Sequence, residues 1–137
     1  KIYLSIGSNK GNRYSFIKEA LRLIQKDIGE VILISKIYET KSWGFQSDDF
    51  LNLCILINSE LIPTKLISKL KKIEEIIGRK RNNDKIEARE IDIDILFYSD
   101  KIVKQKDLII PHQRLHLRNF VYIHLMILQL ILYILFY

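Results

Sequence analysis

Apolar residues recur along this chain with two different periods. Between Asn12 and Gly29 they return at helical spacing, and Asn12 is a residue type that caps helices. A second helical stripe begins at Pro63, a common first-turn residue, and ends at Gly78. The apolar positions of the two predicted helices are Ile17, Ala20, Leu21, Ile24 and Ile28 in the first, and Leu66, Ile67, Leu70, Ile73 and Ile77 in the second. Each helix is therefore expected to bury one face.

Runs of β-branched and aromatic residues predict strands around these helices. They cover residues 2–6, 31–38, 50–58 and 91–98, and residues 108–111 form a further short extended piece. With the helices, the order along the chain is βαββαβ, followed by a C-terminal extension. This order predicts an α+β domain of the ferredoxin-like type, an antiparallel sheet with the helices packed on one face.

The C-terminal end departs from this alternation. Residues 120–137 carry no formal charge and are almost continuously apolar. We divide the chain into a domain at residues 1–121 and an atypical tail at residues 122–137, which is either part of the same domain or an aberrant end. As a helix, the uncharged stretch would span about 27 Å, close to a bilayer core. The alternatives are a helix packed on the domain and an end produced by a shifted reading frame, and His124 and Gln129 argue against a membrane span.

Composition narrows the class of protein. A chain of 137 residues with 48% hydrophobic and 28% charged residues describes one folded domain and excludes a disordered chain. The single cysteine, Cys54, excludes a disulfide framework and a cysteine-based zinc site, which fits a reducing cytoplasm. The formal net charge of +6 indicates an anionic partner, but it does not distinguish nucleic acid, nucleotide phosphate and membrane surface.

Two aspartates in the last long strand carry the clearest chemical signal. Alternation on a strand sends Asp92 and Asp94 to one face and the apolar side chains to the other. The apolar set is Ile91, Ile93, Ile95 and Phe97. Two carboxylates on Cα atoms about 6.6 Å apart repel by about 2.5 kcal/mol at an effective dielectric near 20. Two Mg²⁺ ions about 3.5 to 4 Å apart, held with a polyphosphate, would relieve that repulsion. The alternative is an amphipathic strand with a solvated acidic face.

Basic residues precede the two aspartates. Arg79, Lys80 and Arg81 follow the second predicted helix, where cations favour the helix dipole, but Arg89 lies too far along the chain for that role. Between residues 79 and 94, five cations match five anions. A surface that tracks a nucleic-acid backbone would carry a single sign of charge. The balance of positive and negative residues therefore favours a site in which arginines and carboxylates together bind a metal-bound polyphosphate.

A third polar cluster follows the short extended piece. His112 comes directly after Pro111, with Arg114 and Arg118 close behind. A histidine in such a turn is often structural, and here it could equally contact a nucleotide. The glycine-containing segment 7–11 lacks the Gly-Lys-Ser/Thr ending of a P-loop, so we interpret it as a turn.

Several short motifs occur in a fixed order between residue 2 and about residue 121. They are Ile6-Gly7-Ser8-Asn9, Tyr38-Glu39-Thr40, Gly44 with Phe50-Leu51-Asn52, Glu74 with Gly78-Arg79-Lys80-Arg81, the run from Ala88 to Leu96, and Pro111-His112 with Arg118 and Phe120. Taken together they resemble the 6-hydroxymethyl-7,8-dihydropterin pyrophosphokinase family, and the block from Glu74 to Asp94 is the most specific part. The resemblance implies a ferredoxin-like α+β fold. It also implies Mg²⁺-dependent transfer of diphosphate from ATP to the hydroxymethyl group of the pterin, with AMP as the second product, in folate synthesis.

The resemblance further implies a role for each matching residue. Asp92 and Asp94 would hold two Mg²⁺ ions against the triphosphate and, with Arg79 and Arg89, form the catalytic set. The ATP-binding set is Glu74, Arg79, Arg81, Arg89, His112 and Arg118. The pterin-binding set is Thr40, Trp43, Phe50, Asn52 and Phe120. ATP and the hydroxymethyl pterin are the expected partners of a cytoplasmic monomer, with no nucleic-acid or membrane partner.

The chain departs from the family pattern at three positions besides the tail. Ala88 replaces a common proline, Ile86 replaces a common aromatic residue, and Lys41 stands where a proline is usual.

A non-catalytic ferredoxin-like module that binds RNA or a nucleotide is the alternative function. RNA-binding sheets of this topology display paired aromatic residues on their central strands, and residues 2–6 and 50–55 lack that pair.

Overall fold

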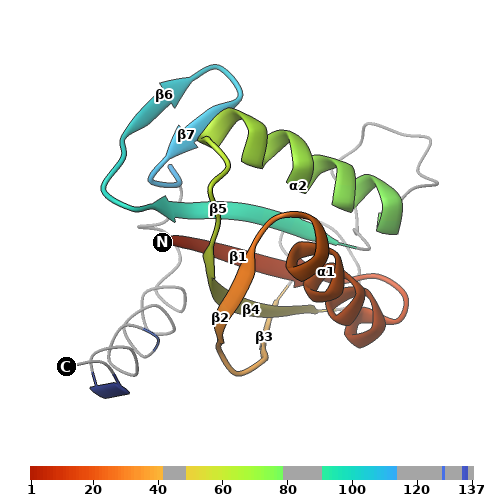
Figure 1. Ribbon diagram of the computed structural model, residues 1–137. Helices are drawn as coiled ribbons and strands as arrows, with labels where there is room; N and C mark the ends of the chain where they lie inside the picture. Colours follow the sequence, from red (N-terminus) through yellow and green to blue (C-terminus); the bar gives the residue numbers. More distant parts are fainter. Residues whose placement is uncertain (42–48, 79–90, 114–127, 129–133, 136–137) are drawn as a thin grey trace.

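The computed structural model describes residues 1–41, 49–78, 91–113, 128 and 134–135 (Figure 1). The elements in these ranges are β1 (Ile2–Ser8), α1 (Arg13–Asp27), β2 (Glu30–Ile34), β3 (Tyr38–Thr40), β4 (Phe50–Asn58), α2 (Pro63–Gly78), β5 (Asp92–Tyr98), β6 (Val103–Gln105) and β7 (Leu108–Ile110). The main sheet has the strand order β2-β4-β1-β5, with β3 also paired to β4, and every pairing is antiparallel. The α+β class with an antiparallel sheet is therefore confirmed.

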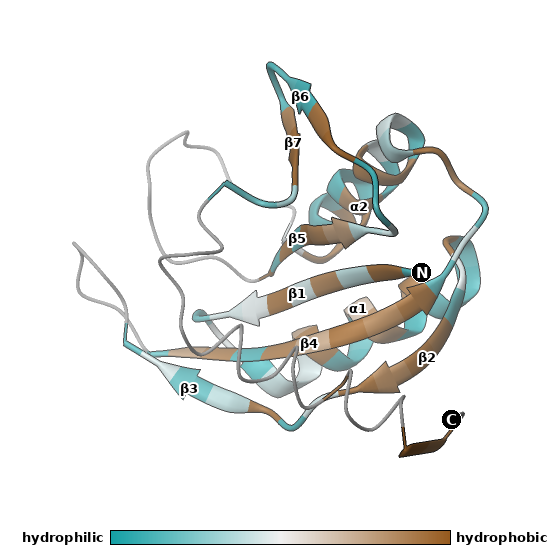
Figure 2. Cartoon of the chain, turned by 90° about the vertical axis from the view of Figure 1, so that its left-hand side faces the viewer, coloured by the Kyte–Doolittle hydropathy of each residue, from teal (hydrophilic) through white to brown (hydrophobic). Residues whose placement is uncertain are grey.

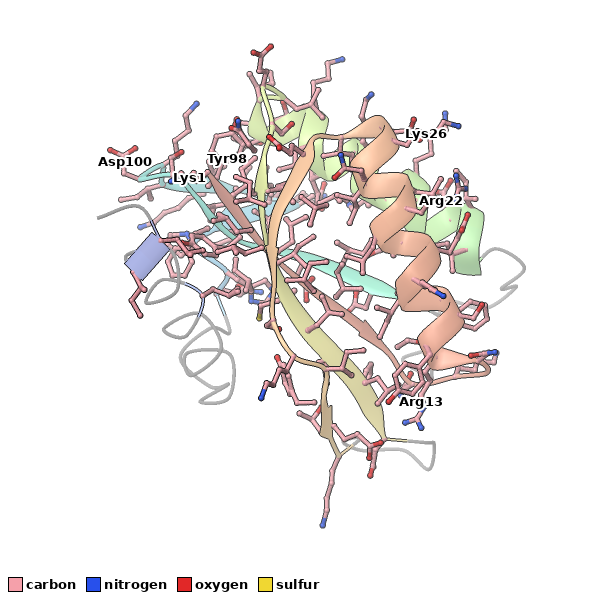
Figure 3. All side chains as sticks on the ribbon, turned by 60° about the horizontal axis from the view of Figure 1, so that its bottom comes forward. Lys1, Arg13, Arg22, Lys26, Tyr98 and Asp100 are labelled. Atoms are coloured by element: carbon pink, nitrogen blue, oxygen red, sulfur yellow. The ribbon has the colours of Figure 1, made fainter. Side chains whose placement is uncertain are left out.

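Both helices begin where the sequence predicts. The side chain of Asn12 accepts a hydrogen bond from the backbone N–H of Ser15 at 3.1 Å, which caps α1. The two helices lie on the same side of the main sheet (Figure 1), while Arg13, Arg22 and Lys26 of α1 point outward (Figure 3). The core between helices and sheet includes Ile17, Ala20 and Ile24 of α1, Leu66, Leu70 and Ile73 of α2, and Leu4, Ile6, Leu53, Ile55, Ile93 and Ile95 of the sheet. Leu21, Ile67 and Ile77 pack at its border.

The strand predicted at residues 31–38 is two strands, so that prediction was wrong. β2 ends at Ile34 and β3 begins at Tyr38, and both pair with β4. Between them, the hydroxyl of Ser35 accepts a hydrogen bond from the backbone N–H of Cys54 at 2.8 Å. A side chain thus takes the place of a backbone acceptor, and the strand is interrupted there.

A bulge in β5 changes which side chains share a face. Tyr3 pairs with Phe97 whereas Leu4 pairs with Ile95, so Leu96 has no partner on β1. Phe97 therefore packs with Tyr3 and Cys54 on the face away from the helices, and the prediction that it joins the isoleucines was wrong. Its ring meets that of Tyr3 edge to face, with centroids 6.3 Å apart.

The face of the sheet away from the helices, here called the second face, has an apolar half and a polar half. The apolar half comprises Tyr3, Leu33, Cys54, Leu96 and Phe97, and Leu128 from the C-terminal tail is buried against it. Ile134 and Leu135 are exposed. Burial of Leu128 is what the packed-helix alternative predicts for that residue, while most of the tail lies outside the described residues. In the parts that the structure describes, no helix is long and apolar enough to cross a membrane.

Candidate active site

The polar half of the second face lies where β4, β1 and β5 run side by side (Figure 2). Gly7 of β1 lies opposite Asn52 on β4 and opposite Asp92 on β5. Two residues earlier on β1, Ser5 lies opposite Asp94. Because Leu4 and Ile6 face the helices, alternation directs Ser5 and Gly7 to the second face. The sheet thus presents a carboxamide and two carboxylates around a glycine.

Gly7 is required because the side chain of Asn52 lies very close to the backbone of β1 at this position. A Cβ atom at this position would lie 2.7 Å from Oδ1 of Asn52, closer than a real methyl group tolerates. Segment 7–11 was interpreted from the sequence as a turn. That interpretation was wrong at the start of the segment, because β1 continues through Gly7 to Ser8. The Oδ1 atom of Asn52 lies where a side chain at position 7 would have to be.

The side chain of Asn52 is held in one orientation. Its Nδ2 donates to Oγ1 of Thr40 at 2.8 Å and to the backbone oxygen of Phe50 at 3.4 Å. Oδ1 consequently points toward Gly7. Thr40, Phe50 and Asn52, for which the family resemblance implies one binding set, are brought together by the pairing of β3 with β4.

His112 and Asp94 meet at the other end of the polar half. Nε2 of His112 lies 3.8 Å from Oδ1 of Asp94, and the two side chains are 21% and 26% exposed. The backbone N–H of His112 donates to the oxygen of Leu96 at 3.1 Å, which ties the segment after β7 to the bulge in β5. The bond between Ile110 and Pro111 is cis. The histidine predicted as a nucleotide contact therefore lies beside a predicted metal ligand.

Glu74 approaches the same strand from α2. Its Oε1 accepts a hydrogen bond from the backbone N–H of Ile93 at 2.8 Å. Ile93 stands between Asp92 and Asp94, and its own side chain is buried in the main core. The carboxylate of Glu74 thus touches the backbone that carries both aspartates.

The remaining predicted site residues lie outside the described residues. They are Trp43, Arg79, Arg81, Arg89, Arg118 and Phe120, and the family departures Ile86 and Ala88 lie outside as well. Lys41 is described and exposed at the end of β3.

Among the residues that the structure describes, the carboxylates of Asp92 and Asp94 are the hard oxygen ligands at this site, and the imidazole of His112 lies beside Asp94. Across the residues with described placement, no group of three or more His, Cys, Asp and Glu side chains gathers as a metal centre. Asp92 and Asp94 supply hard oxygen donors on β5, opposite Gly7 and Ser5 of β1. The donor chemistry fits Mg²⁺, which binds through one or two carboxylates together with phosphate oxygens and water.

The buried thiol of Cys54 lies beside this site without taking part in chemistry. Cys54 faces Ser5 across the β1–β4 pairing. Burial raises the pKa of its thiol to about 11, partly offset by a hydrogen bond with the hydroxyl of Tyr38. The thiol is therefore protonated at neutral pH and is no nucleophile.

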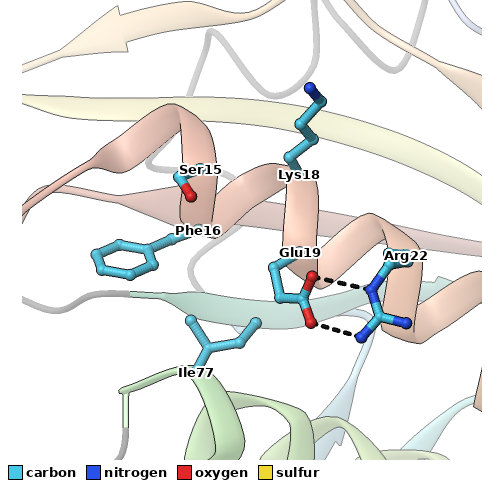
Figure 4. A pocket seen from close by; sticks show the side chains of 6 residues that line it. All are labelled: Ser15, Phe16, Lys18, Glu19, Arg22 and Ile77. Atoms are coloured by element: carbon cyan, nitrogen blue, oxygen red, sulfur yellow. Dashed lines mark hydrogen bonds and ion pairs between the residues drawn. The ribbon is translucent and has the colours of Figure 1, made fainter.

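A hollow of about 620 Å³ between the two helices is separate from this site (Figure 4). Phe16 and Ile77 supply its apolar wall, and Glu19 and Arg22 its charged rim. Arg22 donates to both carboxylate oxygens of Glu19, at 2.9 and 2.6 Å, and this contact lowers the pKa of Glu19. Because Arg22 already binds the carboxylate of Glu19, its guanidinium is less available to bind a phosphate.

Comparisons with known proteins agree on one family. Residues 3–130 match the sequence model of a family described as 7,8-dihydro-6-hydroxymethylpterin-pyrophosphokinase. A 2-amino-4-hydroxy-6-hydroxymethyldihydropteridine pyrophosphokinase from Aquifex aeolicus is 42% identical over 120 residues, which cover 87% of this chain and 74% of that protein. The enzyme of the same name from Porphyromonas gingivalis is 40% identical over 124 residues, 88% of this chain and 84% of that protein. A folate synthesis bifunctional protein from Arabidopsis thaliana is 42% identical over 123 residues, 88% of this chain and 25% of that protein.

Proposed function

Because this chain belongs to the 7,8-dihydro-6-hydroxymethylpterin-pyrophosphokinase family, we propose that it transfers the terminal diphosphate of ATP to 6-hydroxymethyl-7,8-dihydropterin in folate synthesis. The products are the pterin diphosphate and AMP. The observation that carries this proposal is the row formed by Asn52, Gly7 and Asp92, with Asp94 beside it. It combines an amide that can pair with a heterocycle and carboxylates that can bind a metal.

The ferredoxin-like arrangement belongs to the same proposal. It is supported by the βαββαβ order from β1 to β5, with β3 as an addition, and by the strand order β2-β4-β1-β5. In this arrangement one face of the sheet packs on the helices, and the polar half of the second face is proposed to bind the substrates.

The phosphate side of the site is proposed at Asp92, Asp94 and His112. ATP carries negative charge, so two carboxylates repel it unless cations lie between them. Two Mg²⁺ ions, when bound, would neutralise the phosphates and polarise the reacting phosphoryl group. Arg79, Arg81, Arg89 and Arg118 are proposed to bind the phosphates bidentately, with Arg79 and Arg89 in the catalytic set.

The pterin side of the site is proposed at Thr40, Phe50 and Asn52, completed by Trp43 and Phe120. The amide of Asn52 offers both a donor and an acceptor, which suits the mixed edge of a pterin ring. Its orientation is set before the substrate arrives, because Thr40 already accepts from Nδ2. Aromatic side chains above and below a flat ring add stacking energy.

The reaction needs positioning rather than a protein nucleophile. The hydroxymethyl oxygen of the pterin forms a bond to the β-phosphorus of ATP, and the bond between that phosphorus and the α,β-bridging oxygen breaks. The electron pair leaves with AMP, and the hydroxyl proton passes to solvent or to a phosphate oxygen. Holding both substrates in line on one rigid sheet supplies the main rate enhancement, and the cationic groups stabilise the charge that moves.

Matched aspartate variants test the metal site. Asp92→Asn and Asp94→Asn keep the size of the side chains and remove the charge, so we expect turnover to fall by at least about 100-fold, as for the loss of a principal charge-stabilising group. Asp100→Asn is the control, since Asp100 is an exposed residue in the turn after β5. Full activity of the Asp94 variant in a folded protein would show that the metal site lies elsewhere.

A cytoplasmic location and a monomeric state stay predictions from the sequence.

A further inference from the structure

β5 stands at the end of the main sheet, and Glu74 binds its outer edge. Among the strands that the structure describes, in the order β2-β4-β1-β5, β5 pairs with β1 on one side only. The N–H of Ile93 donates to Oε1 of Glu74, so it points away from β1 and toward α2. A helix side chain therefore satisfies a backbone donor that the sheet leaves unpaired.

The position of this hydrogen bond is what gives it significance for catalysis. β5 begins at Asp92, so one of the two proposed metal ligands is the first residue of the strand. Strand ends open more easily than strand centres. Glu74 holds the strand one residue further in, at Ile93, and the side chain of Ile93 is anchored in the core at 2% exposure. The backbone between Asp92 and Asp94 is thus fixed both at its edge and at its buried face.

We propose that Glu74 is a positioning residue, which sets the spacing of the Asp92 and Asp94 carboxylates through the backbone of Ile93. The inference rests on the proposed function of those aspartates and adds a role to the ATP contact that the family resemblance implies for Glu74. A metal–ATP complex needs its ligands placed to within a fraction of an ångström, and this placement depends on the residues that support them.

Two substitutions of Glu74 separate the effect of its side-chain length from the effect of its charge. Glu74→Gln removes the charge and keeps an acceptor oxygen at the same distance along the side chain. Glu74→Asp keeps the charge and draws the oxygens back by one methylene. If Glu74 acts through Ile93, the glutamine variant recovers most of the function that the aspartate variant loses. If it acts as a charge on the nucleotide or the metal, glutamine is the more damaging substitution.

Amide hydrogen exchange of the protein without substrates reports the bond directly. We expect the Ile93 amide to exchange about 10-fold faster in Glu74→Asp, and to stay within about 3-fold of the original protein in Glu74→Gln. Glu75→Ala is the matched control, because Glu75 is the next residue of α2 and is exposed. It should leave the exchange of Ile93 unchanged.

The Mg²⁺ dependence of turnover then tests the link to catalysis. At saturating ATP and pterin, we expect the Mg²⁺ concentration for half-maximal rate to rise about 5- to 20-fold in Glu74→Asp, and to return most of the way in Glu74→Gln. A glutamine variant impaired more than the aspartate variant would overturn the proposal, and so would rapid exchange of Ile93 in the active original protein. An original protein without pyrophosphokinase activity would contradict the proposed function, whereas the exchange of Ile93 would still report whether Glu74 holds the strand.

Discussion

Substitution of Gly7 by alanine tests how the two halves of the site share one sheet. The new methyl group would lie 2.7 Å from Oδ1 of Asn52, so this amide would have to move by several tenths of an ångström. It cannot do so freely, because its Nδ2 donates to Thr40 at 2.8 Å and to the oxygen of Phe50 at 3.4 Å. The substitution should therefore break the arrangement that is proposed to bind the pterin.

The expected magnitude follows from these hydrogen bonds. Loss of one or two neutral hydrogen bonds costs about 1 to 2 kcal/mol, so kcat/KM for the pterin should fall about 5- to 30-fold. The KM for ATP should change by less than about 3-fold, because the three atoms nearest to the methyl group belong to Asn52 and Phe50, which are not among the proposed phosphate ligands. Stability should change little, since alanine is favoured over glycine in a strand by about 0.5 to 1 kcal/mol and offsets part of the local strain.

A double-mutant cycle makes this experiment decisive. The variants are Gly7→Ala, Asn52→Ala and the double substitution, each assayed for kcat/KM with the pterin and for unfolding in urea. If Gly7→Ala acts by displacing Asn52, it should cost almost nothing in the protein that already lacks the amide. Fully additive losses, or an equal rise in the KM for ATP, would refute the reasoning.

Three further predictions concern the neighbourhood of this site. Thr40→Val removes the acceptor for Nδ2 of Asn52 and should raise the KM for the pterin about 3- to 10-fold, which steady-state kinetics at saturating ATP would measure; an unchanged KM would argue against it. Leu128→Ala should lower the free energy of unfolding in urea by about 2 to 4 kcal/mol, and a fully stable variant would show that the tail does not dock. Folding raises the pKa of Cys54 from 9.0 to about 11, so the associated stability is complete below pH 9 and falls by about 3 kcal/mol as pH rises through 11. Urea unfolding across that range should show a steeper alkaline loss than in Cys54→Ala, and equal slopes would contradict the shift.

The regular elements could be predicted because they depend on local pattern. Asn12 and Pro63 mark helix starts by their own chemistry, and the alternation around Asp92 and Asp94 places both carboxylates on one face. The break at Ser35 and the bulge at Leu96 could not be predicted, because both depend on how one strand pairs with another. The hydrophobic pattern restricts the register of paired strands, but it does not show at which residue the pairing shifts or stops.

The residues of the candidate site remain a prediction from the sequence, and the geometry of those that the structure describes could not be predicted from it. Gly7, Asn52 and Asp92 are far apart in the sequence, and only the two pairings of β1 place them in one row. The contact between Glu74 and Ile93 likewise needs α2 to pack on the sheet beside β5. Motif order predicts which residues act together, whereas the three-dimensional register shows which of the described residues touch.

The central claim is that diphosphate leaves ATP only when the hydroxymethyl pterin accepts it. The direct measurement is a product analysis of the purified protein with ATP and Mg²⁺, with and without 6-hydroxymethyl-7,8-dihydropterin, in which AMP and the pterin diphosphate are both quantified. We predict that the two products appear in equal amounts, and only when the pterin is present. Release of AMP at the same rate without the pterin, or formation of ADP in place of AMP, would contradict the account.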